Sequence, residues 1–390
     1  MTPPERHASL SLALIFALRM LGLFLVLPVF ALEAAKFPGG DDPARVGLAM
    51  GIYGLTQGLL QLPFGMASDR LGRKRVIVLG LLLFAVGSFL AAMANSLNGL
   101  LLGRAVQGAG AISAAVTALL ADQTREAVRT KAMALVGGSI ALVFALSLVL
   151  APALAAHIGL AGLFALTGGL ALVGVVVVLW VVPPEPLLHQ NQPRGKLSEV
   201  LSHAGLLRLN FGVFVLHAVQ LAMWMAVPAL LLQAGLDKAH HWWVYLPAVL
   251  GSFAVMGGSL FPLERRGYLR GVFLAAIGLI VLVQGGLLWV VDAPQLSTMA
   301  TLLFLFFCGF NVLEASQPSL ASRMAPAHVR GSALGVYNTL QSLGYFVGGL
   351  AGGALLKWGG THSLFMACGL AMLAWLVVAW PMQTPAKVKA

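Results

Sequence analysis

Four ionisable side chains lie within long apolar stretches of this sequence: Arg19, Arg104, His217 and Glu314. Glu314 is the first candidate for a protonation site, because burial favours the neutral form of a carboxyl group and its charge can be coupled to conformation. A structural acid paired with a neighbour is the alternative. His217 is a further candidate, because histidine is the side chain that most often changes charge near neutral pH, although a single histidine in such a stretch is often a packing residue. Arg19 would suit either an anionic substrate or an acidic side chain, and the sequence favours neither.

Polar side chains recur at helical spacing in the same stretches, which places them in stripes on single helix faces. The stripes are His217, Gln220 and Trp224; Asn311, Glu314 and Pro318; Asn338, Gln341 and Tyr345; and Tyr53, Gln57 and Gln61. Such stripes suit weak hydrogen bonds to a moving substrate, and they suit hydrogen bonds between helices equally well.

The composition places these residues in a membrane. Hydrophobic residues make up 59% of the chain and charged residues 9%, against roughly 25% charged residues in soluble domains, which excludes a water-soluble enzyme. The net charge of +11 is spread over short clusters between apolar runs, so no nucleic acid partner is expected. No cofactor and no metal are expected, because His240 and His241 lack a carboxylate or cysteine that would complete a ligand set.

Twelve apolar runs are each long enough to cross a hydrocarbon core of about 30 Å as a helix. We predict an all-α polytopic membrane protein with spans near 9–32, 44–67, 76–94, 98–120, 131–156, 159–182, 206–232, 242–261, 271–291, 297–320, 330–356 and 363–382. A proline-rich linker over 183–205 separates a six-helix half over 1–182 from a second over 206–390. Val128-Arg129 recurs as Val329-Arg330, which indicates a repeat of parallel orientation.

Lysine and arginine are distributed unevenly between the two sets of loops. One side holds both termini and most of the basic residues, whereas the other holds only Lys36, Arg45, Lys238 and Lys357. By the positive-inside rule, both termini are expected to face the cytoplasm.

The loop between the second and third spans carries the strongest motif, Gly65-Met66-Ala67-Ser68-Asp69-Arg70-Leu71-Gly72-Arg73-Lys74-Arg75. It resembles motif A of the major facilitator superfamily. A small residue at Gly65 would let another helix approach closely, and Asp69 would suit a helix N-terminus. The resemblance implies a latch for the outward-facing state, in which Asp69 caps the eleventh span and Arg73 pairs with Asp122. The latch residues are Gly65, Asp69, Arg70, Gly72, Arg73 and Asp122.

Further motifs extend the resemblance over nearly the whole chain. The stretch 104–110 resembles motif B of proton antiporters, which implies that Arg104 biases proton release; a structural anchor is the alternative. Motif C is weak, because Ala151-Pro152 stands where antiporters carry Gly-Pro. The stretches 19–22, 310–315 and 335–338 resemble the YajR branch of the superfamily. Members of that branch can carry a ferredoxin-like domain after the twelfth span, and none is expected here because the chain stops at Ala390.

The resemblance implies the major facilitator fold, with spans one, four, seven and ten around a central cavity. It also implies a monomer in the bacterial inner (cytoplasmic) membrane that acts on a small-molecule substrate and protons. The candidates for proton coupling are Glu314, Arg104 and His217. The candidates for the substrate cavity are Arg19, Gln57, Gln107, Gln220, Trp224, Asn311, Asn338, Gln341 and Tyr345.

The leading functional hypothesis is proton-coupled efflux of amphiphilic or drug-like compounds by alternating access. In the family motif C accompanies antiport, and its weakness here keeps a proton-coupled symporter as the alternative. A receptor or scaffold that binds a ligand without translocation is a further alternative. An enzyme is disfavoured, because the sequence contains no zinc-protease, serine-hydrolase or carboxylate-rich metal motif.

Overall fold

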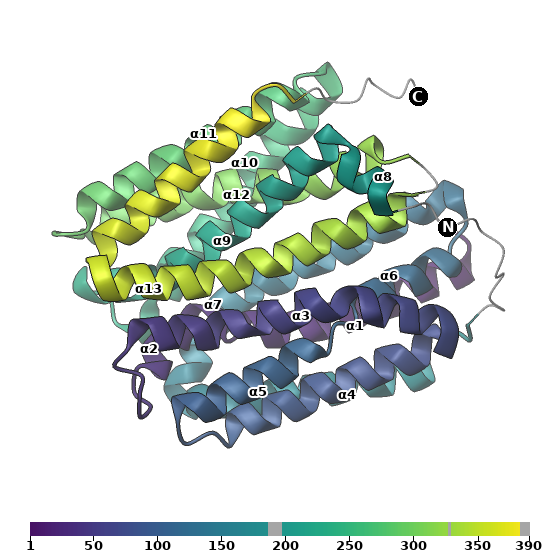
Figure 1. The fold of residues 1–390 in the computed structure, drawn as a ribbon, viewed down its shortest axis with the longest axis horizontal. Helices are drawn as coiled ribbons and strands as arrows, with labels where there is room; N and C mark the ends of the chain where they lie inside the picture. The colour runs from purple at the N-terminus through teal and green to yellow at the C-terminus, as the bar shows by residue number, and fades with distance from the viewer. Residues whose placement is uncertain (186–196, 327–328, 383–390) are drawn as a thin grey trace. The chain divides into compact units, whose positions relative to one another are not determined.

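The computed structural model describes residues 1–185, 197–326 and 329–382, which are mostly helical (Figure 1). The chain divides into two units, Met1–Gln192 and Pro193–Ala390. Nine described segments are long and apolar enough to span a membrane, and two of these, with 51 and 50 residues, each contain two helices joined at a glycine. These nine segments therefore contain eleven helices. A less apolar helix, α3 (Pro43–Leu71), is the twelfth transmembrane helix within the described residues.

The N-terminal unit begins several helices with local side-chain caps. Thr2 accepts a hydrogen bond from the Glu5 backbone, Asp42 from Ala44, and Ser96 from Gly99, so each cap satisfies a backbone N–H group that the first helical turn leaves free. The unit contains α1 (Pro3–Phe24), α2 (Leu27–Ala34), α3, α4 (Arg73–Ala92), α5 (Leu97–Ala109), α6 (Ser113–Asp122), α7 (Glu126–Val176) and the π-helical turn η1 (Val177–Val181).

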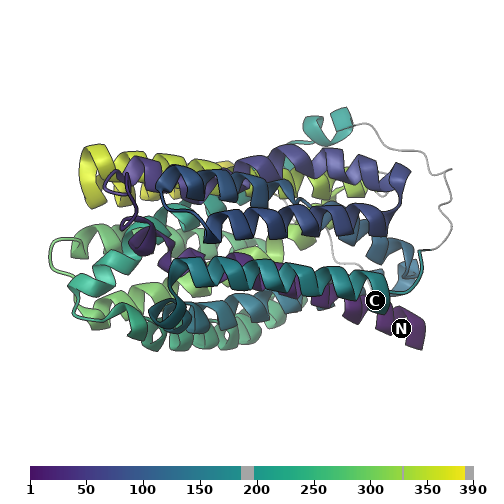
Figure 2. The same cartoon turned by 90° about the horizontal axis from the view of Figure 1, so that it is seen from below.

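Two predicted spans are interrupted, which corrects the expectation of continuous helices. The first span divides into α1 and α2 before Pro28, whose ring nitrogen has no hydrogen to continue the helical hydrogen bonds. The fourth span divides into α5 and α6 around Gly110, where a Cβ atom would lie 2.4 Å from the carbonyl oxygen of Gly80. The close approach of α4 therefore accompanies the second break, and α4 and α5 lie side by side (Figures 1 and 2).

The two longest helices, α7 and α13 (Arg330–Ala379), each contain one residue with non-helical backbone angles. Gly159 in α7 has φ +64° and Gly360 in α13 has φ +67°, a region that residues with a Cβ atom rarely adopt. In Figure 1 the chain runs along α13, reverses, and returns as the yellow segment. The two glycines are separated by the same number of residues as Arg129 and Arg330, so the matching turns extend the internal repeat.

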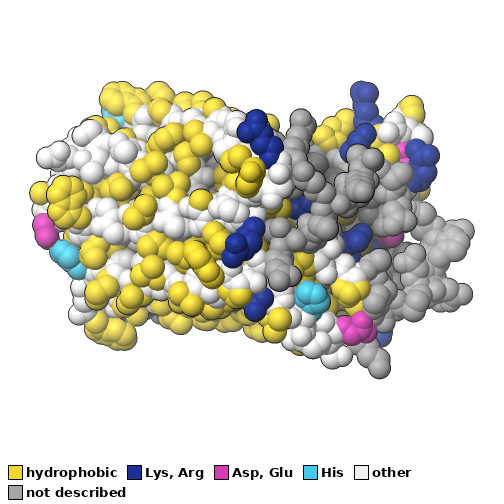
Figure 3. All heavy atoms as spheres, turned by 90° about the horizontal axis from the view of Figure 1, so that it is seen from above, with side chains coloured by type: hydrophobic (Ala, Val, Ile, Leu, Met, Phe, Trp, Pro, Cys, Tyr) yellow, Lys and Arg dark blue, Asp and Glu magenta, His cyan; other side chains and the backbone are white. Residues whose placement is uncertain are grey.

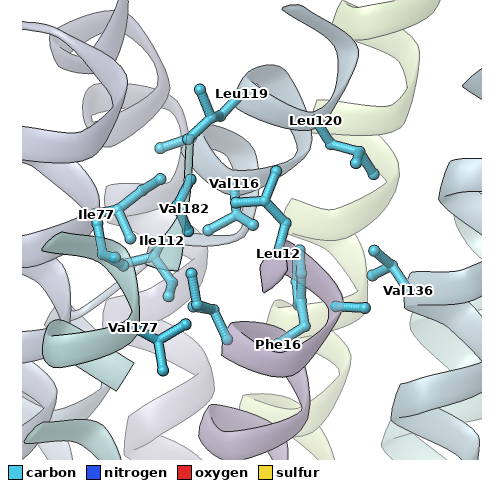
Figure 4. Close-up of a cluster of buried hydrophobic side chains, with 14 of the residues drawn as sticks. Leu12, Phe16, Ile77, Ile112, Val116, Leu119, Leu120, Val136, Val177 and Val182 are labelled. Carbon is cyan, nitrogen blue, oxygen red and sulfur yellow. The ribbon is translucent and has the colours of Figure 1, made fainter. Parts of the chain in front are cut away.

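The hydrophobic core of the N-terminal unit brings together α1, α4, α6, α7 and η1 (Figure 4). The residues labelled there are Leu12, Phe16, Ile77, Ile112, Val116, Leu119, Leu120, Val136, Val177 and Val182. Within a bilayer such contacts stabilise by packing more than by exclusion of water. This core holds the end of α6, where Asp122 lies, beside the start of α4, where Arg73 lies.

The C-terminal unit places α13 against both α9 and α11, and it places α12 against α10 and α11. Its helix α9 begins at a side-chain cap, because His203 Nδ1 accepts a hydrogen bond from Leu206 N at 3.2 Å. The unit contains α8 (Leu197–Ser202), α9 (Ala204–Gln233), the 3-10 turn η2 (Lys238–His240), α10 (Trp242–Arg266), α11 (Leu269–Val290), α12 (Leu296–Met324) and α13.

The surface has the character of a membrane protein. On the face shown in Figure 3, hydrophobic side chains are spread over the left half, whereas Lys and Arg side chains lie from the middle to the right. Exposed tryptophans, Trp180, Trp289 and Trp358, lie near helix ends, where aromatic rings suit the interface between lipid head groups and acyl chains.

Candidate functional site

In the C-terminal unit, three side chains from three helices form a group that we call the carboxylate–histidine cluster: Glu314, His217 and Gln341. Glu314 Oε2 of α12 lies 3.3 Å from His217 Nε2 of α9. Gln341 Nε2 of α13 lies 2.8 Å from His217 Nε2 and 3.4 Å from Glu314 Oε1. The His217 side chain is 1% exposed and that of Glu314 is 37% exposed. The carboxylate is therefore the member of the pair that solvent can reach.

The hydrogen bonds of His217 determine which ring nitrogen carries a hydrogen. His217 Nδ1 lies 2.8 Å from the carbonyl oxygen of Val213, and because a carbonyl only accepts, Nδ1 must donate. In the neutral ring Nε2 is then an acceptor, which suits the amide hydrogens of Gln341. A second proton on Nε2 would make the ring a cation that faces Glu314. The cluster can therefore hold a proton on the carboxylate or on the ring.

A row of glycines on α13 brings Gln341 against α9. A Cβ atom at Gly344 would lie 2.4 Å from the carbonyl oxygen of Phe214, and one at Gly348 would lie 2.2 Å from that of Ala218. The two helices therefore approach along their backbones, as small residues at one-turn spacing allow. Gln341 lies about one turn before Gly344, so this close contact sets the reach of its side chain.

Aromatic rings enclose the imidazole of His217. The Tyr345 ring lies edge-on at 4.9 Å between ring centroids, and the Phe310 ring lies at 6.1 Å with a similar orientation. Tyr337 is buried nearby on α13, and its hydroxyl makes no hydrogen bond among the residues that the structure describes. Apolar ring edges around His217 favour a pair with no net charge over a charged one.

In the N-terminal unit, Arg19 is buried and bonded only to neutral side chains. Its Nη2 donates to Tyr53 Oη at 2.8 Å and to Gln57 Oε1 at 3.3 Å, both on α3. Its Nη1 donates to Ser113 Oγ at 3.1 Å, at the start of α6. Arg19 therefore joins α1 to α3 and α6 without an acidic partner among the described residues of this unit.

Arg104 contacts the ring of the same tyrosine. Its guanidinium carbon is 4.8 Å from the centroid of the Tyr53 ring, a cation–π distance. Its Nη1 donates to Gln107 Oε1 at 2.7 Å and its Nη2 to the Met50 carbonyl at 3.2 Å, while Gln107 Nε2 donates to Ser88 Oγ at 2.9 Å. We call Arg19, Arg104 and the side chains that they contact the arginine cluster.

The arginine cluster depends on the close packing of α5 against α3 at Gly108. A Cβ atom there would lie 2.1 Å from Thr56 Oγ1 and 2.3 Å from the Tyr53 carbonyl oxygen. We expect Gly108→Ala to destabilise the protein by about 1–3 kcal/mol, the usual cost of overpacking, as measured by thermal unfolding of the purified protein. Gly169→Ala is the matched control, because nothing lies within 4 Å of its added Cβ. Equal stability of the two variants would contradict the prediction.

Arg73 is the centre of the motif A loop, residues 65–75. Its Nη1 pairs with Asp69 and also donates to Ser68 Oγ at 2.7 Å, and its Nε pairs with Asp122 Oδ2 at 3.1 Å. Arg73 thus ties α4 to the ends of α3 and α6. Arg70 is exposed. A Cβ at Gly65 would lie 3.4 Å from that of Ala114 within this unit, and the close approach of another helix at Gly65 stays a prediction.

A glutamate from the segment after η1 also holds the motif A loop. Glu185 Oε2 accepts from the Arg73 backbone N–H at 2.8 Å, and Oε1 accepts from that of Lys74 at 2.9 Å. Gly72, which joins α3 to α4, has φ +100°, a conformation that favours glycine. Lys74 Nζ donates to the Val182 carbonyl at 2.6 Å. Glu185 thereby caps α4, and the start of the predicted linker is attached to the latch residues.

The sequence profile of the Major Facilitator Superfamily matches residues 12–349. This chain belongs to that superfamily. It is 42% identical over 389 residues to the inner membrane transport protein YajR of Escherichia coli K12, an alignment that covers 99% of this chain and 85% of the relative. The quinolone resistance protein NorA of Staphylococcus aureus MRSA252 is 25% identical over 383 residues, 95% of each chain. The solved structure of the nucleoside transporter NupG has a TM-score of 0.76 at 14% identity, covering 96% of this chain and 99% of that one.

Membership of the Major Facilitator Superfamily confirms the predicted fold class, an all-α membrane protein of twelve transmembrane helices. The protein is a multi-pass membrane transporter and not an enzyme. The likeness to YajR confirms the predicted resemblance to that branch of the superfamily.

Four predicted cavity residues of this transporter make no hydrogen bond to the carboxylate–histidine cluster within the described part of the chain: Gln220, Trp224, Asn311 and Asn338. Asn311 Nδ2 donates to Ser252 Oγ of α10 at 2.7 Å, which is a bond between helices. Trp224 packs edge-on against Tyr245 at 5.4 Å between centroids. Gln220 is buried and its Oε1 has no partner among the described residues, and Asn338 is half-buried.

Several residues that lie in or beside the two clusters and the motif A loop were not among the predicted site residues. Ser88 and Ser113 are small hydroxyl residues on apolar helices, and no sequence pattern distinguishes them from packing residues. Tyr337 precedes the predicted Asn338, and a search for every polar group of that helix would have included it. Glu185 lies between prolines just after the sixth span, and an acid at that position is the one available signal.

Proposed function

We propose that this transporter exports small amphiphilic or drug-like compounds across the bacterial cytoplasmic membrane in exchange for protons. The observation that carries the proposal is the distance of 3.3 Å between Glu314 Oε2 and His217 Nε2 at membrane depth. The relation to a quinolone resistance protein supports a drug-like cargo. In this proposal both termini face the cytoplasm, the protein works as a monomer, and the halves 1–182 and 206–390 move about the linker 183–205.

The proton step follows from the charge of the pair. With one proton, the pair is neutral, either as protonated Glu314 beside neutral His217 or as a carboxylate beside an imidazolium. Without that proton the pair carries one negative charge, which is costly to bury at membrane depth. Glu314 Oε2 accepts no hydrogen bond from the described residues, so it is the oxygen that can take the proton. Closure of the transporter around the pair would therefore require prior protonation.

The motif A loop is the proposed latch that stabilises one of the alternating states. Asp69 and Asp122 both pair with Arg73, and Glu185 fixes the backbone of the same residue. Charge-assisted hydrogen bonds are stronger than neutral ones, so the loop forms a rigid unit at the ends of α3, α4 and α6. A rigid end is suited to bind or release another element as one body.

The test uses purified protein in liposomes that contain a pH-sensitive dye, with an acidic interior imposed at the start. We expect addition of a transported amphiphile to discharge the pH gradient, and liposomes without protein to keep it. Candidate compounds include a quinolone, a neutral amphiphile and a cationic dye. Movement of a compound out of the liposomes in the same direction as the protons would instead identify symport. A gradient that no compound discharges would refute proton-coupled drug transport.

A further inference from the structure

We propose that the arginine cluster binds the anionic group of the substrate, and that the cargo is therefore an amphiphilic anion such as an organic carboxylate. This inference rests on the proposed transport function and adds the chemical class of its substrate. It concerns Arg19 and Arg104, two cations that both contact Tyr53.

The two guanidinium groups are buried without compensation of charge. Arg19 and Arg104 are each 1% exposed, and their hydrogen-bond acceptors are hydroxyl, amide and carbonyl oxygens. No carboxylate of the described N-terminal unit lies within 4.0 Å of either one. A buried charge at membrane depth normally has an opposite charge or water beside it. A cluster with two positive charges and no acid therefore has a strong preference for an anion.

The acids of this unit are committed elsewhere. Glu5 pairs with Arg125 at 2.7 Å, and Glu33 pairs with Lys36 at 2.8 Å. Of the other described acids, Asp41 is exposed, and the rest hold the motif A loop or cap a helix: Asp69, Asp122, Glu185 and Asp42. None of these contacts includes the arginine cluster, so no described acid of the N-terminal unit supplies the missing negative charge.

The cluster also retains hydrogen-bond donors without acceptors. Arg19 makes three hydrogen bonds and Arg104 two, whereas a guanidinium group offers five N–H donors. The Nε atoms of both arginines are buried and unpartnered among the described residues. A buried donor without an acceptor is costly. A carboxylate would accept several such donors at once, and the Tyr53 hydroxyl could donate its own hydrogen to the same ligand.

A cationic cargo would meet the opposite situation. Two positive charges that contact one tyrosine repel a third cation, and low dielectric surroundings strengthen that repulsion. Neutral compounds could use the amide and hydroxyl groups but would leave the charge uncompensated. The arginine cluster would therefore select its ligand by charge.

The test measures equilibrium binding to the full chain in lipid nanodiscs, without a pH gradient. Three probes share one aromatic body and differ in the polar group: 1-naphthoate, 1-naphthamide and 1-naphthylmethylammonium. We expect naphthoate to bind at least about 10-fold more tightly than the other two, because only its polar group carries a negative charge to pair with the two guanidinium groups. Tighter binding of the ammonium probe, or no saturable binding of naphthoate up to millimolar concentration, would overturn the proposal. This comparison needs no variant.

Variants then assign the binding to the cluster. We expect Arg19→Gln and Arg104→Gln each to weaken naphthoate binding by about 10-fold or more, and Arg19→Lys, which keeps the charge, to weaken it less. Arg45→Gln is the matched control, because Arg45 is bonded to Asn98 at a loop and lies outside the cluster. Thermal unfolding checks that each variant is folded. Unchanged affinity in both glutamine variants would refute the assignment.

The outcome separates this inference from the proposed proton coupling. Naphthoate binding without any proton movement would support the anion site and refute the coupling. Proton movement driven by cationic compounds, with no naphthoate binding, would support the coupling and refute the anion site.

Discussion

Replacing Glu314 with glutamine is expected to reduce substrate-driven proton movement by about 100-fold or more. Glutamine has nearly the same shape and can keep a hydrogen bond to Gln341, but it cannot exchange a proton. Because proton transfer by a positioned group typically contributes about 100-fold or more, its removal should eliminate coupling. The measurement is the discharge of an imposed pH gradient in proteoliposomes on addition of a transported compound. Exchange of labelled for unlabelled compound, which needs no net proton transfer, should persist.

The chain provides a matched control for this prediction. Asp292 and His362 form a second carboxylate–histidine pair, also at 3.3 Å, but the Asp292 side chain is 81% exposed. Asp292→Asn is expected to leave proton movement unchanged, because an exposed pair exchanges protons with water whatever the state of the transporter. If Glu314→Gln and Asp292→Asn behave alike, the proton site lies elsewhere.

Transport should persist without His217, but its dependence on pH should change. His217→Gln keeps a polar side chain near Glu314 but removes the second protonation position. We expect the rate of pH-gradient discharge to fall by about 10-fold and its pH profile to shift, because one residue alone then sets the charge of the pair. Loss of activity at every pH together with loss of folding would indicate a packing role for His217.

The sequence predicted the elements of this protein better than their contacts. Apolar runs of sufficient length predicted the helices, because a spanning helix satisfies its own backbone hydrogen bonds and needs only a local pattern. The helical spacing of Asn311 and Glu314 was also a local property. What spacing could not predict was that Asn311 bonds to Ser252 on α10, whereas Glu314 lies beside His217 on α9. The two residues have different partners because different helices pack against the two sides of α12.

Two contacts show why the rest required a structure. Gln341 reaches His217 because glycines on α13 permit backbone contact with α9, and the partner of a glycine row cannot be identified from one sequence. Glu185 contacts Arg73 across 112 positions of the chain. The break before Pro28 was locally encoded and could have been predicted, whereas the break at Gly110 accompanies the approach of α4.

Replacing Arg73 with alanine is expected to slow transport by about 10-fold or more while leaving substrate affinity nearly unchanged. The variant removes two ion pairs and leaves Asp69 and Asp122 without their shared cation. The carboxylates are 27% and 33% exposed, so solvent screens each pair and its contribution is about 1 kcal/mol. In the proposed latch these pairs support the state in which the loop is docked, and loss of about 2 kcal/mol from that state alone changes its population by about 30-fold. Transport rate and equilibrium binding, measured on the same preparation, separate the two effects.

Arg75→Ala provides the comparison that assigns this effect to the latch. Arg75 lies in the first turn of the same helix, is exposed, and makes no hydrogen bond or ion pair within the described part of the chain. The Arg75→Ala variant removes the same charge from the same loop as Arg73→Ala does. A general electrostatic effect on membrane binding or topology would therefore appear in both variants. If Arg73→Ala slows transport and Arg75→Ala does not, the effect depends on the specific contacts of Arg73 to Asp69 and Asp122. If both variants are slowed equally, the basic charge of the loop matters and the latch does not.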